Sequence, residues 1–95
     1  MKLSQRFDQA FLLASELHAD QTRKSVDVPY ISHLLATSAL VLEYGGGEDE
    51  AIAALLHDAV EDQGGLPTLD IIREQFGDEV AEIVAGCTDS FENEK

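Results

Sequence analysis

The stretch AIAALLHDAVED, residues 51–62, decides the fold and contains most of the chemistry of this chain. Its first six residues are apolar almost all round a helix, which predicts a helix enclosed at the centre of the protein. The next six include one histidine and three carboxylates. Charged groups at the exit of a buried helix are costly unless something compensates them, and a bound cation would do so.

Helical spacing also dominates on both sides of this stretch. Apolar residues recur every three or four positions, and Gly, Pro and Asp mark the breaks. No segment of useful length alternates with period two, so the chain is predicted to be all-α with about five helices. The expected helices cover about residues 5–19, 29–44, 49 to 60 or 62, 69–76 and 79–86. Ser4, Thr68 and Asp78 are the expected caps of the first, fourth and fifth.

Size and composition indicate one small domain. The chain has 95 residues, of which 44% are hydrophobic and 26% are charged, values that are ordinary for a soluble protein. A single cysteine, Cys87, excludes an internal disulfide and favours a reducing compartment. The first residues lack the apolar region of a signal peptide, and no apolar run approaches a membrane span. These features predict a cytoplasmic protein that does not engage the membrane.

The formal net charge of −13 is unevenly distributed. Residues 48–95 contain fourteen acidic residues and two basic ones, whereas residues 1–47 contain five and four. Such a surface argues against nucleic-acid binding, which depends on basic patches. Two explanations stay open: a basic partner or chain segment covers the acidic half, or the acidity serves solubility.

Two histidines and a carboxylate could hold a metal ion. His33 falls on the second expected helix, and His57 and Asp58 are adjacent on the third. A single histidine in a helix is more often a core or surface residue than a ligand, but this combination on neighbouring helices is a stronger indication. Imidazole nitrogen with carboxylate oxygen suits divalent manganese, iron, nickel or zinc rather than calcium.

Glu61 and Asp62 add two carboxylates one helical turn after His57 and Asp58. The simpler explanation of this pair is a solvated helix end. Against it, the helix macrodipole disfavours carboxylates at a C-terminus, and a bound cation would offset that cost. Four ionisable groups are therefore expected to cluster where the buried helix leaves the core.

Four blocks of the sequence resemble a known family. They are TRKS at 22–25, PYISHLL at 29–35, ALLHDAVED at 54–62 and FGDEVAEIVAGCTD at 76–89. In these blocks the chain resembles the HD-domain phosphohydrolases, and among them the small alarmone hydrolases and the hydrolase domain of RelA/SpoT-type proteins. The resemblance implies an HD-domain helical bundle around one divalent metal, usually manganese. It also implies hydrolysis of the 3′-pyrophosphate of guanosine tetraphosphate (ppGpp), which releases pyrophosphate and GDP.

The resemblance assigns roles to residues at matching positions. It implies that the metal is held by His33, His57 and Asp58. It implies that the attacking water is positioned and activated by Glu61 and Asp62, and that the nucleotide is contacted by Arg23 and Lys24. Arg23 and Lys24 are the only basic residues between Arg6 and Arg73 in the sequence. A phosphate-rich substrate is therefore expected to bind at this loop and at the metal.

The family's metal site also uses a fourth ligand, an aspartate from a later helix, which has no counterpart here. We therefore expect residues 1–95 to be the N-terminal part of an HD domain, with exposed apolar surface that favours a homo-oligomer or a partner. Two other functions stay open: hydrolysis of another nucleotide or a phosphodiester, and a truncated, non-catalytic domain that acts in assembly. His18 is expected to have a structural role, joining the end of the first helix to the loop that follows.

Overall fold

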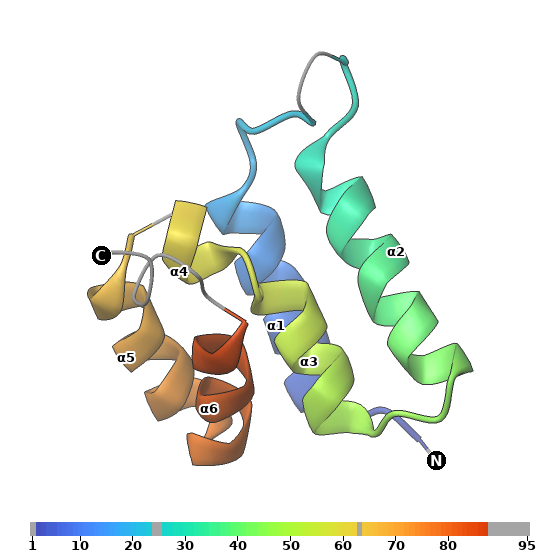
Figure 1. Ribbon diagram of the computed structural model, residues 1–95, viewed down its shortest axis with the longest axis vertical. Coiled ribbons are helices and arrows are strands. Elements are labelled where there is room, and N and C mark those ends of the chain that lie inside the picture. Colours follow the sequence, from blue (N-terminus) through green and yellow to red (C-terminus); the bar gives the residue numbers. More distant parts are fainter. Residues whose placement is uncertain (1, 24–25, 63, 88–95) are drawn as a thin grey trace.

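Residues 2–23, 26–62 and 64–87 are described by the computed structural model, with the backbone alone for Glu61 and Asp62. They form six helices, which confirms the all-α prediction (Figure 1). None of these helices combines the length and apolar character that crossing a membrane requires. The helices are α1 (Gln5–Leu17), α2 (Tyr30–Glu43), α3 (Glu48–Leu56), α4 (Ala59–Asp62), α5 (Leu66–Phe76) and α6 (Asp78–Gly86).

The central element is α3, as its apolar run predicts. All six residues from 51 to 56 are buried. α3 packs against α1, α2 and α6, and Figure 1 shows α2 on one side of it and α5 and α6 on the other. Because neighbouring helices cover every face of this stretch, apolar residues are favoured at every position of it.

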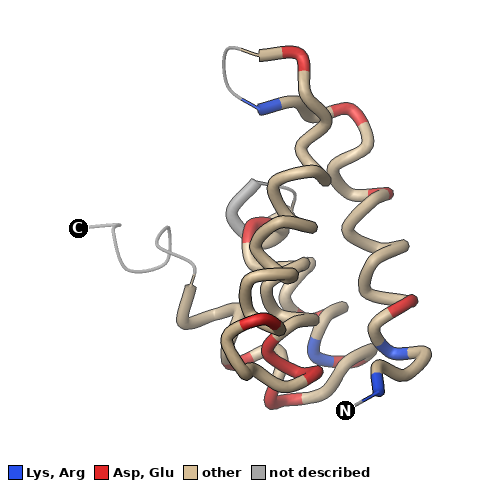
Figure 2. The backbone as a smooth tube through the Cα atoms, turned by 90° about the vertical axis from the view of Figure 1, so that its right-hand side faces the viewer, with Lys and Arg blue, Asp and Glu red and all other residues tan. Residues whose placement is uncertain are grey.

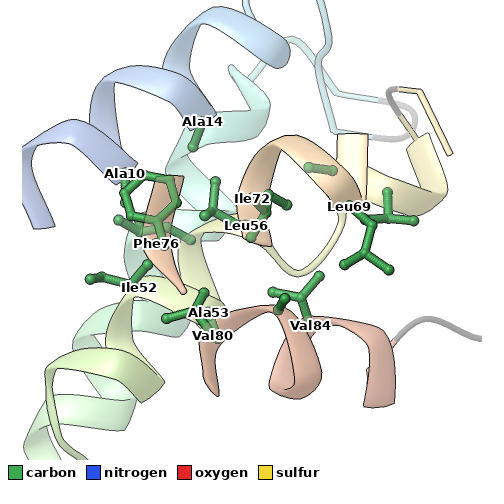
Figure 3. Close-up of a cluster of buried hydrophobic side chains, with 14 of the residues drawn as sticks. Ala10, Ala14, Ile52, Ala53, Leu56, Leu69, Ile72, Phe76, Val80 and Val84 are labelled. Carbon is green, nitrogen blue, oxygen red and sulfur yellow. The ribbon is translucent and has the colours of Figure 1, made fainter. Parts of the chain in front are cut away.

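The hydrophobic core lies between α3 and the helices around it (Figure 3). Ile52 and Leu56 of α3 are fully buried at its centre. On α1 the core residues are alanines, which allow that helix to approach α3 closely, whereas α5 and α6 contribute larger side chains. These residues are Ala10 and Ala14 of α1, Leu69, Ile72 and Phe76 of α5, and Val80 and Val84 of α6.

A turn at His57 and Asp58 divides the expected helix over residues 49–62 into α3 and α4. At this turn Nδ1 of His57 lies 2.6 Å from the carbonyl oxygen of Ala54. A side chain that bonds to a carbonyl of the helix ladder is a recognised cause of a helix interruption. The prediction of one continuous helix is therefore wrong. His57 and Asp58, two of the three candidate metal ligands, lie in the turn that follows the buried helix.

The last two helices also begin differently from the prediction. α5 begins at Leu66, so Thr68 is a buried residue of its first turn rather than its cap. Pro67 favours this early start because its fixed φ suits the first turn of a helix. α6 has Gly77 as its cap, and Asp78 is its first helical residue. Gly77 has φ +98°, a left-handed conformation open to glycine, which allows α5 to end and α6 to begin at one residue.

Acidic residues gather at the end of the bundle where α3 and α6 begin (Figure 2). Glu48, Asp49 and Glu50 form the first turn of α3, and Asp78 and Glu79 lie in the first turn of α6. A helix N-terminus carries a partial positive charge that stabilises carboxylates in its first turn. This placement accounts for part of the acidic half of the sequence without a basic partner.

Arg6 joins three helices at this acidic end. Its Nη1 lies 2.8 Å from Asp49 Oδ1 and 3.7 Å from Glu48 Oε1. Its Nη2 donates to the carbonyl of Phe76, the last residue of α5, at 2.7 Å. Ser4 caps α1 by accepting from the N–H of Arg6, and its hydroxyl donates to Glu48 at 2.7 Å. The N-termini of α1 and α3 are thus tied to the C-terminus of α5.

The central position of α3 generates a prediction for stability. We expect Ile52→Ala to lower the free energy of unfolding by about 2–5 kcal/mol, because the substitution leaves a cavity in the core. Ile71→Ala is the matched control, since Ile71 is 49% exposed on α5, and it should change stability by about 0.5 kcal/mol or less. Chemical denaturation measures both values. Equal losses in the two variants would contradict the central placement of α3.

The pKa of Glu48 generates a prediction for pH dependence. Hydrogen bonds from the backbone and hydroxyl of Ser4, together with the charge of Arg6, hold the pKa of Glu48 below its usual value of 4.5. A carboxyl group with a lowered pKa stabilises the fold above its usual pKa, and this contribution is lost as the pH falls through the folded-state pKa. We therefore expect Glu48→Gln to be less stable than the unchanged protein at neutral pH, with a difference that shrinks below pH 4.5.

Denaturant titrations across this pH range measure that difference. Glu74→Gln, at an exposed position of α5, removes a carboxylate of the same kind and serves as the control. If the stability of Glu48→Gln followed the same pH dependence as that of Glu74→Gln, the stabilising role of Glu48 would be refuted.

Candidate metal centre

The side chains that could hold a metal come from α2 and from the turn between α3 and α4. A short loop joins the end of α2 to the start of α3, so the first turn of α2 lies beside the end of α3 (Figure 1). The buried hydroxyl of Ser38 ties the two helices together by donating to the carbonyl of Ala51 at 2.9 Å. His33, in the first turn of α2, is thereby brought to His57 and Asp58.

His33, His57 and Asp58 converge on one point. One potential ligand atom from each lies within 4.8 Å of the other two. His57 Nε2 is 3.2 Å from Asp58 Oδ1, and His33 Nε2 is 3.8 Å from Asp58 Oδ2. Metal–ligand bonds of about 2.0–2.2 Å place two ligand atoms at most about 4.4 Å apart. The donor atoms therefore fit a divalent ion after a small inward movement.

The surroundings of these side chains also suit a metal ligand set. The side chains of His33, His57 and Asp58 are 32%, 22% and 16% exposed, so the site is partly withdrawn from water but open on one side. The Nδ1 of His57 faces the carbonyl of Ala54, and a carbonyl can only accept a hydrogen bond. The proton of a neutral His57 ring is therefore assigned to Nδ1, which leaves the lone pair of Nε2 directed at the site.

Tyr30 also reaches this site, a placement that was not predicted from the sequence. Its hydroxyl donates a hydrogen bond to Asp58 Oδ2. Tyr30 precedes His33 by three residues on α2, a spacing that places both side chains on one face of the helix. That spacing is the signal in the sequence that could have indicated its position.

His18 has the structural role expected of it. It is 2% exposed, and its ring stacks on that of Tyr30 with centroids 5.1 Å apart. Its Nδ1 lies 2.7 Å from the side-chain Oε1 of Gln21, whose backbone carbonyl accepts from the N–H of Tyr30 at 2.8 Å. His18 therefore joins the end of α1 to the loop and, through Tyr30, to the start of α2.

The other predicted functional residues are placed less completely. The backbone of Glu61 and Asp62 lies in α4, next to the turn, but their side chains fall outside the described part of the chain, as does Lys24. Arg23 is exposed in the loop before α2, where its N–H donates to the carbonyl of Val28 at 2.9 Å. Because α4 has four residues, the macrodipole argument for a cation beside Glu61 and Asp62 loses most of its force.

An apolar hollow of about 410 Å³ opens beside His57. It lies between α2, α3 and α6, and its walls include Val41, Ala53, Ile83 and Cys87. Hollows of this volume are within the range that small molecules occupy. The candidate centre is therefore polar at its three converging side chains and apolar on one flank.

Two histidines and a carboxylate that converge between neighbouring helices of an α-helical domain have the donor atoms of a divalent-metal site. Residues 10–94 match the family described as HD domain. The chain therefore belongs to the HD domain family, which confirms the resemblance in its sequence blocks.

Within the HD domain family, the chain is similar in sequence to several curated proteins. Over 80 residues the chain is 48% identical to a probable GTP pyrophosphokinase of Mycobacterium leprae (strain TN), a match that covers 84% of this chain and 10% of that protein. Over 83 residues it is 39% identical to the bifunctional (p)ppGpp synthase/hydrolase SpoT of Escherichia coli (strain K12), covering 87% of this chain and 11% of that protein. The chain spans about a tenth of the length of these curated relatives.

A solved structure has the same fold. It is that of a metazoan ortholog of SpoT that hydrolyzes ppGpp and plays a role in starvation responses. The superposition has a TM-score of 0.87 at 30% sequence identity and covers all of this chain and 54% of that one. The HD-domain helical bundle predicted for this chain is therefore confirmed.

The hydrogen bond between His18 and Gln21 generates a prediction. Gln21→Ala should lower the free energy of unfolding by about 1–3 kcal/mol, because it leaves Nδ1 of a buried ring without that partner. Gln9→Ala, at an exposed position of α1, is the matched control and should change stability by about 0.5 kcal/mol or less. Thermal or chemical unfolding compares the two, and equal stability of both variants would show that the bond does not hold the loop.

Proposed function

We propose that this chain carries the metal centre of a phosphohydrolase that cleaves the 3′-pyrophosphate of ppGpp. The convergence of His33, His57 and Asp58 within 4.8 Å is the observation that carries the proposal. The relative named (p)ppGpp synthase/hydrolase and the ppGpp-hydrolyzing metazoan ortholog support the choice of substrate. We also propose that the protein is cytoplasmic. That it forms a homo-oligomer stays a prediction from its sequence.

His33, His57 and Asp58 would hold the metal, which we propose to be manganese. Two imidazoles and one carboxylate suit first-row divalent ions, and manganese accepts more oxygen ligands than zinc does. When bound, such an ion lowers the pKa of a water molecule toward neutrality and withdraws charge from a phosphoryl oxygen. The hydrogen bond to the Ala54 carbonyl keeps the His57 ring turned with Nε2 toward this position.

Glu61 and Asp62 are proposed to position the attacking water and to accept its proton. A carboxylate within hydrogen-bonding reach of a water molecule can act as a general base. Glu61 and Asp62 follow Asp58 by three and four positions, so their backbone is close in sequence to the proposed site. The water oxygen forms a bond to phosphorus and the bond from phosphorus to the ribose 3′ oxygen breaks. The proton taken from the water is returned to the 3′ oxygen, so that pyrophosphate and GDP are the products.

Arg23 and Lys24 are proposed to bind the phosphates of the nucleotide. An acidic protein repels a polyphosphate except where cations are concentrated. The loop that carries Arg23 is held by an isolated antiparallel bridge between Thr22 and Pro29, next to the start of α2. This bridge gives the basic side chain a fixed base at the same end of α2 as His33.

The assay for this function measures pyrophosphate release from ppGpp by the protein loaded with Mn²⁺. We expect Asp58→Asn to weaken both Mn²⁺ binding and hydrolysis. Glu61→Gln should retain Mn²⁺ binding and lower kcat by about 10²–10⁴-fold, the range typical for loss of a general base. Asp70→Asn and Glu74→Gln, at exposed positions of α5, are matched controls that should retain both properties.

Two outcomes would contradict the proposal. If the protein with Mn²⁺ bound released no pyrophosphate from ppGpp, the proposed reaction would be wrong. If it hydrolysed other nucleotides or a phosphodiester in preference to ppGpp, the enzyme class would stand and the substrate would be wrong.

A further inference from the structure

Three side chains approach the carboxylate of Asp58 from two directions, and one of them, Tyr30, makes a hydrogen bond to it. His57 Nε2 lies 3.2 Å from Oδ1, whereas His33 Nε2, at 3.8 Å, and the hydroxyl of Tyr30 both approach Oδ2. Tyr30 donates to this oxygen, and a neutral hydroxyl adds no positive charge that would compete with a metal ion. The hydrogen bond restricts rotation of the carboxylate about its last side-chain bond.

The ring of Tyr30 is itself held in place. It stacks on His18 with centroids 5.1 Å apart and an angle of 29° between the ring planes. His18 is 2% exposed and bonds through Nδ1 to Gln21, and the N–H of Tyr30 donates to the carbonyl of the same residue. The hydroxyl therefore reaches Asp58 from a fixed position rather than from a mobile side chain.

We propose that Tyr30 is a positioning residue for the metal centre: its hydroxyl fixes the carboxylate of Asp58 in the orientation that faces His33 and His57. The inference rests on the proposed function, because it assumes that these three residues hold a metal. Hydrogen bonds from neighbouring side chains to a ligating carboxylate keep it oriented, and their loss typically weakens metal binding by about 10–100-fold. Tyr30 would act through Asp58 and not by contact with the ion.

The test compares Tyr30→Phe with Tyr44→Phe, because each removes one tyrosine hydroxyl and Tyr44 is 85% exposed. Mn²⁺ affinity is measured by electron paramagnetic resonance of free Mn²⁺, on samples whose helical content by circular dichroism matches that of the unchanged protein. We expect Tyr30→Phe to weaken Mn²⁺ binding by about 10–100-fold and Tyr44→Phe to leave it unchanged. In an Asp58→Ala background, which removes the acceptor of the Tyr30 hydrogen bond, Tyr30→Phe should weaken binding no further, because the two changes act on one interaction.

A readout without metal separates this inference from the proposed function. The metal-free protein should show a slowly exchanging, low-field hydroxyl proton by NMR that is lost in Tyr30→Phe and in Asp58→Ala but retained in Tyr44→Phe. Equal Mn²⁺ affinity of the unchanged protein and Tyr30→Phe would overturn the inference alone. A loss of affinity in Tyr30→Phe that persists in the Asp58→Ala background would overturn it as well. Failure of the unchanged protein to bind Mn²⁺ would overturn the proposed metal centre and this inference together.

Discussion

The complete burial of α3 is the constraint on which the rest of the structure depends. Its apolar residues are removed from water only when other helices cover each face, and α1, α2 and α6 provide that cover. The short connection from α2 to α3 makes α2 one of these helices and sets its first turn beside the last turn of α3. The approach of His33 to His57 and Asp58 is therefore a consequence of hydrophobic packing, which brings their ligand atoms within 4.8 Å of one another.

Negative charge lies at both ends of α3, in different surroundings. At its start, three carboxylates lie in the first helical turn, where the backbone N–H groups, Ser4 and Arg6 stabilise them. At its end, Asp58 lies among two imidazoles and the Tyr30 hydroxyl. The first arrangement consists of ion pairs and hydrogen bonds between described residues, whereas the second has the donor atoms and the spacing of a cation site.

The loop between α1 and α2 links the fold to the site. The bridge between Thr22 and Pro29 and the contacts of His18 hold this loop against the helical bundle. The loop delivers Tyr30 to Asp58 and carries Arg23 to the same end of α2. Loops held on a rigid scaffold commonly carry binding residues, because the scaffold fixes their ends while their surface stays accessible. Here the buried His18 helps to give the loop that rigidity through its contacts with Gln21 and Tyr30.

The sequence by itself determined the all-α class, the central position of residues 51–56 and the three side chains that converge, because hydrophobic period and residue chemistry are local properties. Only the tertiary structure decided that the helix breaks at His57 and Asp58, that Thr68 is buried inside α5, and that Tyr30 bonds to Asp58. Each of these features depends on another group in the fold. The helix break depends on the Ala54 carbonyl near the His57 ring, the position of Thr68 on the early helix start at Pro67, and the Tyr30 bond on the approach of α2 to Asp58. Periodicity along the chain shows which face of a helix is apolar, but the group opposite that face is set by how the helices pack.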